Sequence, residues 1–249
     1  TLDSQYKPAS LLLAANVAAI ADLTDMSAPG QQNVSVVIGQ DGSGTAKTLF
    51  DDESATGSVT CIGRALGALS LAAVHESIAW VQKFPAGIDN PAMADGSLVK
   101  ELDESVLEAL NTKRFIFLRK HGGIAGSYFN DSHTMELATS DYAFIESVRT
   151  MDKAIRGIRT YVLPYLSSPL YVNPSTGKLR QDTCSFLETL AGKAPEDMER
   201  AGELSGIRVT VDPNQNVLSS SEVEFVIQQV AVGVMRKVKV KIGYTTVLS

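Results

Sequence analysis

The sequence predicts an α/β (α+β) protein in which mixed sheets pack with helices and a C-terminal β-strand forms an arm. Two observations predict this class. Residues 141–165 carry apolar side chains at the spacing of a helix, whereas residues 236–247 alternate between apolar and basic side chains, as a strand does. With 249 residues, of which 44% are hydrophobic, the chain can bury a substantial core.

The N-terminal part is expected to contain helices, one strand and loops. A helix is expected from about residue 10 to 23, because this stretch is rich in Ala and Leu and follows Pro8. The stretch also resembles the apolar part of a signal peptide, but acidic residues follow it closely, which favours a core helix. Residues 33–39 predict a short buried strand, residues 39–57 a polar surface loop, and residues 58–81 a packed helix or helix pair.

A long loop is expected at residues 84–98, where Pro and Gly are frequent and apolar residues are few. Such a loop is a candidate boundary between two regions. We therefore expect an N-terminal α/β region over residues 1–102 and a C-terminal domain over residues 103–249.

The strongest helix prediction covers residues 141–165, where Ser140 or Asp141 can cap the start and Pro164 falls at the end. Its apolar positions form one stripe, so the helix should be amphipathic. The other helices of the C-terminal domain are expected at residues 103–110, 181–190 and 195–204, and its strands at 114–119, 207–212, 223–232 and 236–247.

Charge and cysteine content argue against several functional classes. The formal net charge of −6 argues against a general nucleic-acid binder, because phosphate contacts need clustered Lys and Arg. Cys61 and Cys184 lie far apart in apolar stretches, so buried free thiols are expected rather than a disulfide framework or zinc site. No apolar run is long enough to cross a bilayer. We expect no cofactor, no nucleic-acid partner and no membrane partner.

One glycine-rich stretch resembles a phosphate-binding loop at first sight. A P-loop needs Lys directly after the last Gly, whereas Thr45 and Ala46 separate Gly44 from Lys47, and no clear helix is predicted to begin there. A surface loop is the favoured interpretation. A small-molecule binding module that uses the loop from Gly39 to Gly44 stays open as an alternative.

Asp131, Ser132 and His133 place an acid, a nucleophile and a base in one predicted loop. Catalytic triads assemble in space, so adjacency in sequence is weak evidence, and no nucleophile elbow accompanies these residues. A hydrolase that uses them is a second alternative. His75 begins a sequence similar to a zinc-protease motif, but Ala79 stands where the second histidine must be, so no metal site is predicted.

The last predicted strand has apolar side chains on one face and basic side chains on the other. At a sheet edge it would expose backbone groups that invite association, and alternating lysines commonly protect such an edge. The strand therefore either belongs to the chain's own sheet or adds to the sheet of another subunit. The residues of this expected intersubunit arm are Arg236, Lys237, Val238, Lys239, Val240, Lys241, Ile242 and Tyr244.

Several stretches of sequence carry a family resemblance. They are VHESIAW at 74–80, FLRKHGG at 117–123, SYFNDSH at 127–133, SDYAFIE at 140–146, DKAIRG at 152–157 and DPNQNVL at 212–218. With the order of the predicted elements, they resemble contractile phage tail sheath proteins, and the Mu-like prophage tail sheath group in particular. The resemblance covers nearly the whole chain, and these motifs carry no chemistry.

The resemblance implies a structural virion protein without catalytic activity. Copies would polymerise as a helical sheath around the tail tube of a phage or a related contractile injection system, linked by arms that add strands to neighbouring subunits, and would contract during injection. The implied partners are further copies of the chain, the tail tube, the baseplate and tail terminator proteins. The implied location is the virion tail, and the host cytoplasm during assembly. Sheath proteins of this kind usually have more chain before the stretch that matches Thr1, so upstream chain is expected to be missing here.

Overall fold

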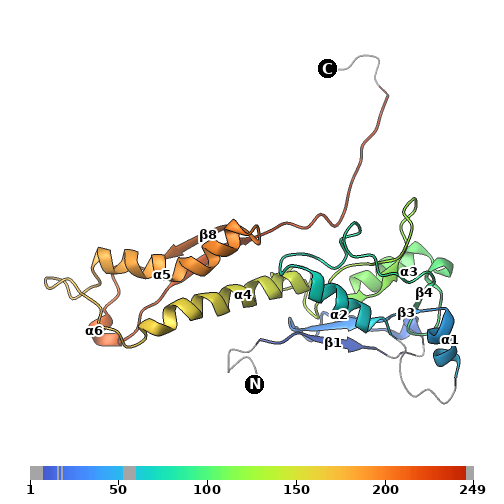
Figure 1. Ribbon diagram of the computed structural model, residues 1–249, viewed down its shortest axis with the longest axis horizontal. Coiled ribbons are helices and arrows are strands. Elements are labelled where there is room, and N and C mark those ends of the chain that lie inside the picture. The colour runs from blue at the N-terminus through green and yellow to red at the C-terminus, as the bar shows by residue number, and fades with distance from the viewer. Residues whose placement is uncertain (1–7, 16, 18, 53–59, 245–249) are drawn as a thin grey trace.

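The computed structural model describes residues 8–15, 17, 19–52 and 60–244. Figure 1 shows an elongated molecule with a block of small sheets and helices at one end and a helical hairpin covered by a sheet at the other. The long helix α4 (Ile145–Val162) leads from the first block into the second. The mixture of helices and sheets confirms the predicted α/β (α+β) class.

The first block is built on a parallel three-stranded sheet in the order β1-β2-β5. Two antiparallel pairs, β3 with β4 and β6 with β7, continue from it, because β3 follows β2 and β6 follows β5 after a single residue. The strands are β1 (Leu11–Ala14), β2 (Val34–Val37), β3 (Gly39–Asp41), β4 (Pro91–Met93), β5 (Phe115–Ile116), β6 (Leu118–Arg119) and β7 (Tyr128–Phe129).

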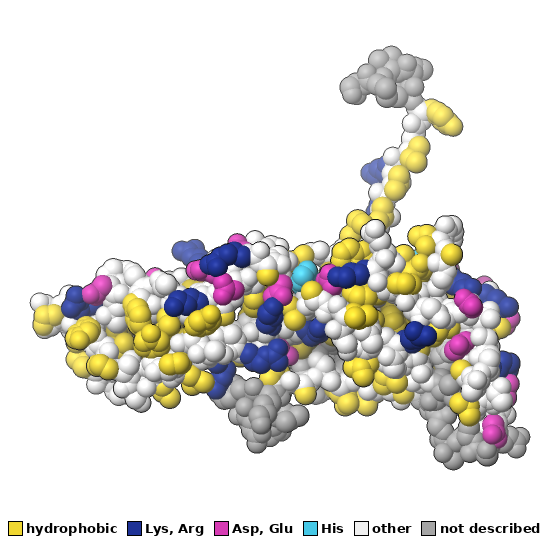
Figure 2. Space-filling model, viewed as in Figure 1, with side chains coloured by type: hydrophobic (Ala, Val, Ile, Leu, Met, Phe, Trp, Pro, Cys, Tyr) yellow, Lys and Arg dark blue, Asp and Glu magenta, His cyan; other side chains and the backbone are white. Residues whose placement is uncertain are grey.

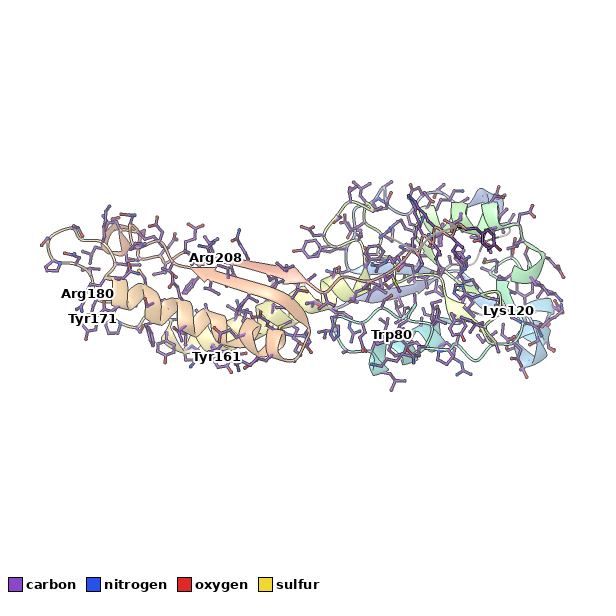
Figure 3. All side chains as sticks on the ribbon, turned by 90° about the horizontal axis from the view of Figure 1, so that it is seen from above. Trp80, Lys120, Tyr161, Tyr171, Arg180 and Arg208 are labelled. Atoms are coloured by element: carbon purple, nitrogen blue, oxygen red, sulfur yellow. The ribbon has the colours of Figure 1, made fainter. Side chains whose placement is uncertain are left out.

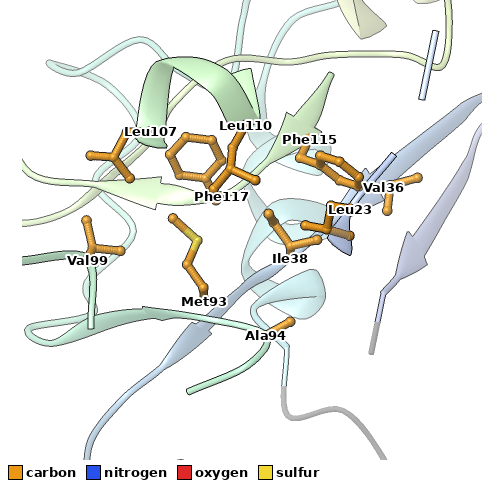
Figure 4. Packing of buried hydrophobic residues seen from close by; sticks show 10 residues of the cluster. All are labelled: Leu23, Val36, Ile38, Met93, Ala94, Val99, Leu107, Leu110, Phe115 and Phe117. Atoms are coloured by element: carbon orange, nitrogen blue, oxygen red, sulfur yellow. The ribbon is translucent and has the colours of Figure 1, made fainter. Parts of the chain in front are cut away.

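The core of this block lies on both faces of the parallel sheet. Neighbouring residues of a strand point to opposite faces. Val36 and Phe115 accordingly pack in one apolar cluster with residues of α3 (Figure 4), whereas Val37 and Ile116 pack in a second cluster with Ala65 of α2. The helices of this block are η2 (Ile20–Asp22), α1 (Gly44–Asp51), α2 (Ile62–Leu71), η3 (Val99–Glu101) and α3 (Glu104–Thr112).

The helix expected at residues 10–23 is wrong. Leu11–Ala14 forms β1 instead and pairs with β2 in parallel, from Leu11 beside Val34 to Ala14 beside Val37. Its Ala and Leu content favours a helix in isolation, but tertiary pairing overrides so weak a preference. The strand expected at residues 33–39 is confirmed by β2.

Two expected loops also contain regular structure. Within residues 39–57, β3 is followed by α1, which begins directly at Gly44. Within residues 84–98, β4 pairs with β3 and is wholly buried, so the segment is part of the core and no exposed linker. The described part of residues 58–81, which begins at Thr60, gives a single helix, α2, followed by turns.

The second block consists of two packed helices and one antiparallel sheet. The helix expected at 141–165 is confirmed as α4, which starts at Ile145 without a side-chain cap from Ser140 or Asp141. Its first turn is held by backbone contacts, as Ile145 donates to the carbonyl of Ser132. The remaining elements are η4 (Leu163–Tyr165), α5 (Gln181–Arg200), β8 (Leu204–Thr210), α6 (Val217–Ser220) and β9 (Val226–Ala231).

A single helix, α5, replaces the two helices expected at 181–190 and 195–204. Pro195 lies inside it and is buried. Proline lacks the amide that would bond the preceding turn, which usually ends or kinks a helix. Here α5 packs against both α4 and β8, and this burial on two sides keeps the helix continuous.

Candidate assembly interface

The C-terminal arm, residues 237–244, is an extended segment that stands away from both blocks (Figure 1). Within the described residues it joins no sheet, so the third strand expected in this region does not form within a single chain. The side chain of Val238 is 67% exposed and that of Ile242 is 92% exposed. Figure 2 shows these apolar groups along an arm that stands clear of the body.

Alternation divides the arm into two faces. Successive side chains of an extended segment point in opposite directions, so Val238, Val240 and Ile242 share one side. Lys237, Lys239 and Lys241 fall on the other side. An exposed apolar stripe of this kind, on backbone without a ladder partner, is the chemistry of a strand that pairs with a sheet elsewhere.

The sheet formed by β8 and β9 offers two free edges in the described part of the chain, because each strand has the other as its partner. The strands run alongside α5, and Arg208, labelled in Figure 3, lies on β8. On the face away from the helices, Arg208 of β8 and Gln228 of β9 are paired and exposed. Lys153 of α4 bonds both carboxylate oxygens of Glu203, at 2.5 and 2.6 Å, which ties α4 to the start of β8.

Arg236, at the root of the arm, is fixed to the first block. Its Nε lies 3.0 and 3.1 Å from the two carboxylate oxygens of Asp131, and its Nη2 donates to Oε1 of Glu146. Its guanidinium lies 3.4 Å from the centre of the Phe144 ring, within the range of a cation–π contact. We call this cluster of Arg236, Asp131, Glu146 and Phe144 the Arg236 latch.

The latch residues are positioned by the junction between the two blocks. Asp131 follows β7, and Glu146 lies in the first turn of α4. Asn130 holds the loop after β7 in place, since its side chain accepts a bond from the amide of Phe117 and donates to the carbonyl of Phe115. A backbone bridge between His133 and Phe144 then brings this loop beside the start of α4.

Burial makes the latch electrostatically strong. The side chains of Asp131 and Glu146 are 10% and 6% exposed, and that of Arg236 is 26% exposed. Burial raises the pKa of Glu146, although the Ser132 hydroxyl and the charge of Arg236 act to lower it. Two buried carboxyl groups side by side repel each other when ionised. Arg236 forms ion pairs with both, and the charges of Arg114 and Arg149 also act on Asp131 and Glu146, respectively.

Sequence reasoning placed Arg236 in the arm and did not identify its partners. The sequence holds only indirect signals of this cluster. Arg236 is the single arginine beside three alternating lysines, and an arginine is the cation best suited to bind two carboxylates at once. Asp131 and Glu146 both lie in stretches that carried the family resemblance.

The geometry at Asp131, Ser132 and His133 does not form a catalytic triad. The hydroxyl of Ser132 donates to Glu146, whereas Nε2 of His133 lies 2.9 Å from the side-chain oxygen of Asn111. Burial lowers the pKa of His133 to about 4, with a smaller opposing effect from Asp131. The base and the nucleophile that a hydrolase needs therefore have separate partners, and the structure does not support this alternative.

The loop from Gly39 to Gly44 borders a hollow of about 200 Å³. Contrary to expectation, a helix begins there, as in a phosphate loop. The ammonium of Lys47 nevertheless lies 2.6 Å from Asp51 on the same helix, so its charge is already paired. Across the described ranges, no group of three or more His, Cys, Asp and Glu side chains could hold a metal ion. Nor does any helix of these ranges have the length and apolar character needed to cross a membrane.

Two family models match the sequence. One describes the N-terminal domain of DUF2586 and covers residues 6–133, and the other describes the C-terminal domain of DUF2586 and covers residues 141–249. The chain belongs to the DUF2586 family. No curated protein matches the sequence of this DUF2586 member.

Solved structures with the same fold include chains of a sheath complex and a baseplate and a sheath tail protein. A chain of the anti-feeding prophage (AFP) baseplate has a TM-score of 0.60 and 14% identity, and the match covers 97% of the DUF2586 chain and 62% of that chain. A chain of the PVC sheath complex, an extracellular contractile injection system in its contracted state, has a TM-score of 0.60 and 11% identity. This match covers 94% of the DUF2586 chain and 64% of the PVC chain.

The sheath tail protein from Desulfitobacterium hafniense has a TM-score of 0.53 and 12% identity, and the match covers 92% of the DUF2586 chain and 50% of that protein. At 11–14% identity, these matches show similarity of fold alone. The DUF2586 chain thus spans less than two thirds of the length of these three structures. The predicted resemblance to contractile sheath proteins is confirmed at the level of the fold.

Proposed function

We propose that this DUF2586 chain is a structural subunit of a contractile tail sheath and has no catalytic activity. It polymerises helically around the tail tube of a phage tail or related contractile injection system. Its further partners are the baseplate and tail terminator proteins, and its place is the virion tail after assembly in the host cytoplasm. The division into residues 1–102 and 103–249 stays a prediction.

The observation that carries this proposal is the C-terminal arm. Lys237–Tyr244 is extended, apolar on one side and without a sheet partner in the described chain, while β8 and β9 each present a free edge. The arm therefore supplies a strand, and the sheet of a neighbouring subunit supplies the edge that receives it. At roughly 1 kcal/mol net for each ladder hydrogen bond, a junction of five or six bonds contributes several kcal/mol. A helical polymer repeats this junction at every subunit.

The proposal is consistent with the fold shared with sheath and baseplate proteins of contractile machines. It is also consistent with the different partners of the Ser132 and His133 side chains, Glu146 and Asn111, which give the loop after β7 a structural role. The alternating lysines then add positive charge to an otherwise acidic protein, which favours docking on the acidic surface of a second copy.

Electron microscopy of the purified chain tests the proposal. We expect hollow helical tubes from the full chain. When the chain is truncated after Arg236, we expect folded subunits without tubes, because this variant keeps the Arg236 latch and loses the arm with the residues that follow it. A matched control replaces Lys237, Lys239 and Lys241 with Gln and keeps the backbone and the apolar stripe; it should still assemble. Tubes of normal length from the truncated chain would contradict the proposal.

A further inference from the structure

The arm has a competing partner within its own chain. Between the end of β9 at Ala231 and Arg236 lie four residues, a usual length for a hairpin loop. Gly233 lies among them, and glycine readily adopts the backbone angles that a tight turn requires. A turn at this point would lay the arm antiparallel along the free edge of β9.

Such a hairpin would match the side chains of both strands. Pairing Ala231 with Arg236 places Val240 beside Ile227 on the half-buried face of β9 and Lys239 beside Gln228 on the exposed face. Linked segments meet at an effective concentration of about 1 mM, so at about 10 µM protein the internal partner is favoured over a second copy by about a hundredfold. A subunit with the arm folded back could neither give its strand nor receive one at β9.

The latch holds the chain out of this hairpin. All three partners of Arg236 belong to the junction of the first block with α4, outside the sheet of β8 and β9. A guanidinium bound there cannot stand opposite Ala231 at the same time. Met235 and Lys237, on either side of Arg236, line the same hollow beside Trp80 and Asn130, so the whole root of the arm lies on the first block.

We propose that Arg236 is the residue that directs the arm to a second copy of the chain, because its latch prevents the arm from closing on its own β9. This inference rests on the proposed sheath function. It assigns to Asp131, Glu146 and Phe144 the role of positioning residues, which act on assembly through Arg236. The latch also gives both acids an ion-pair partner in a buried site, where carboxylates that lack one are unfavourable.

A disulfide trap tests the direction of the arm. Cys61 and Cys184 are buried, so Gln228→Cys with Lys239→Cys introduces the accessible thiol pair, and these positions face each other in the closed hairpin. Arg236→Ala alone would leave two buried carboxylates without the guanidinium that bonds them. The variant without a latch therefore combines Arg236→Gln with Asp131→Asn and Glu146→Gln, which removes all three charges and keeps the shapes.

In dilute monomer under mild oxidation, we expect the internal disulfide to form about tenfold faster or more without the latch than with it, because the linked strands then meet freely. Assembly of the same variant without the added cysteines should need a correspondingly higher protein concentration. Lys237→Gln, a neighbouring change outside the latch, should leave both readouts as in the parent. Equal rates of disulfide formation with and without the latch overturn the inference, whether or not tubes form. Absence of tubes from the unmodified chain would instead contradict the sheath function, while the disulfide rates still decide the role of the latch.

Discussion

Gly157 of α4 lies directly against Ala194 of α5. A Cβ atom at position 157 would be 2.5 Å from the Cβ of Ala194, closer than real Cβ atoms approach one another. The neighbour is a methyl group on a helix, which cannot rotate out of the way. The contact holds the hairpin of α4 and α5 together under the sheet that offers the free edges.

This contact predicts that a larger side chain at position 157 destabilises the protein. Overpacking of a core typically costs about 1–3 kcal/mol, whereas the gain in helix propensity on replacing Gly is about 1 kcal/mol or less. We expect Gly157→Val to lower the free energy of unfolding by about 2 kcal/mol, as measured by urea denaturation. Gly67 of α2 is the matched control, because a Cβ atom there meets no atom within 4 Å. Gly67→Val should leave stability nearly unchanged or raise it slightly, and a similar loss at both positions would argue against close packing at Gly157.

The latch predicts that replacing Arg236 lowers the free energy of unfolding far more than replacing the neighbouring Lys237. Loss of one partner from a buried ion pair typically costs about 3–5 kcal/mol, and the partly exposed side chain of Arg236 places it at the lower end. Lys237 is exposed, and surface substitutions usually change stability by less than about 0.5 kcal/mol. We therefore expect Arg236→Ala to lower the free energy of unfolding by about 3 kcal/mol and Lys237→Ala to leave it nearly unchanged. Chemical denaturation at neutral pH measures both, and equal effects would show that the latch is open in solution.

The parts of the fold that the sequence predicted well are those whose pattern depends on local spacing. The stripe over residues 141–165 became α4, and the strands expected at residues 207–212 and 223–232 became β8 and β9. The failures occurred where distant partners decide the structure. Leu11–Ala14 is a strand because β2 lies beside it, and Pro195 stays within a helix because α5 is packed on two sides.

In the candidate interface too, local sequence patterns predict some features, whereas distant partners decide others. The alternation of the arm could be read from the sequence. The bonds of Arg236 to Asp131 and Glu146 join residues separated by 105 and 90 positions, which no local pattern encodes. Asp131 and Ser132 attracted attention as possible catalytic groups because a single sequence does not show that each is bound to a partner elsewhere.

The two cysteines predict slow reaction with thiol reagents in the native state. Cys61 and Cys184 are buried, and burial raises the pKa of Cys61 to about 12 and also raises that of Cys184. The thiolate is the reactive form, so both groups should react only as the chain opens. A colorimetric thiol assay at pH 8 should detect neither cysteine rapidly in native protein and both in urea. Rapid labelling of one thiol without denaturant would contradict its burial.

His133 predicts a loss of stability in mild acid. Burial, the largest effect, lowers its pKa in the folded protein from 6.5 to about 4; the charges of Arg114 and Arg236 act in the same direction and that of Asp131 opposes them. Between these values the unfolded chain binds a proton that the folded chain does not, so stability falls as the pH drops from 6.5 toward 4. The full difference corresponds to about 3 kcal/mol.

His133→Gln isolates this contribution, because glutamine can still donate to the side-chain oxygen of Asn111 and does not titrate. Glu146 has the opposite effect, since its raised pKa lets the folded protein bind a proton first as the pH falls. The free energy of unfolding of the parent and of His133→Gln is therefore measured between pH 7.5 and about 4.5. The difference between the two proteins is then taken, because Glu146 contributes to both and its effect cancels. We expect the parent to lose stability relative to His133→Gln as the pH falls below 6.5, and parallel pH profiles would show that His133 is protonated as readily in the folded chain as in the unfolded one.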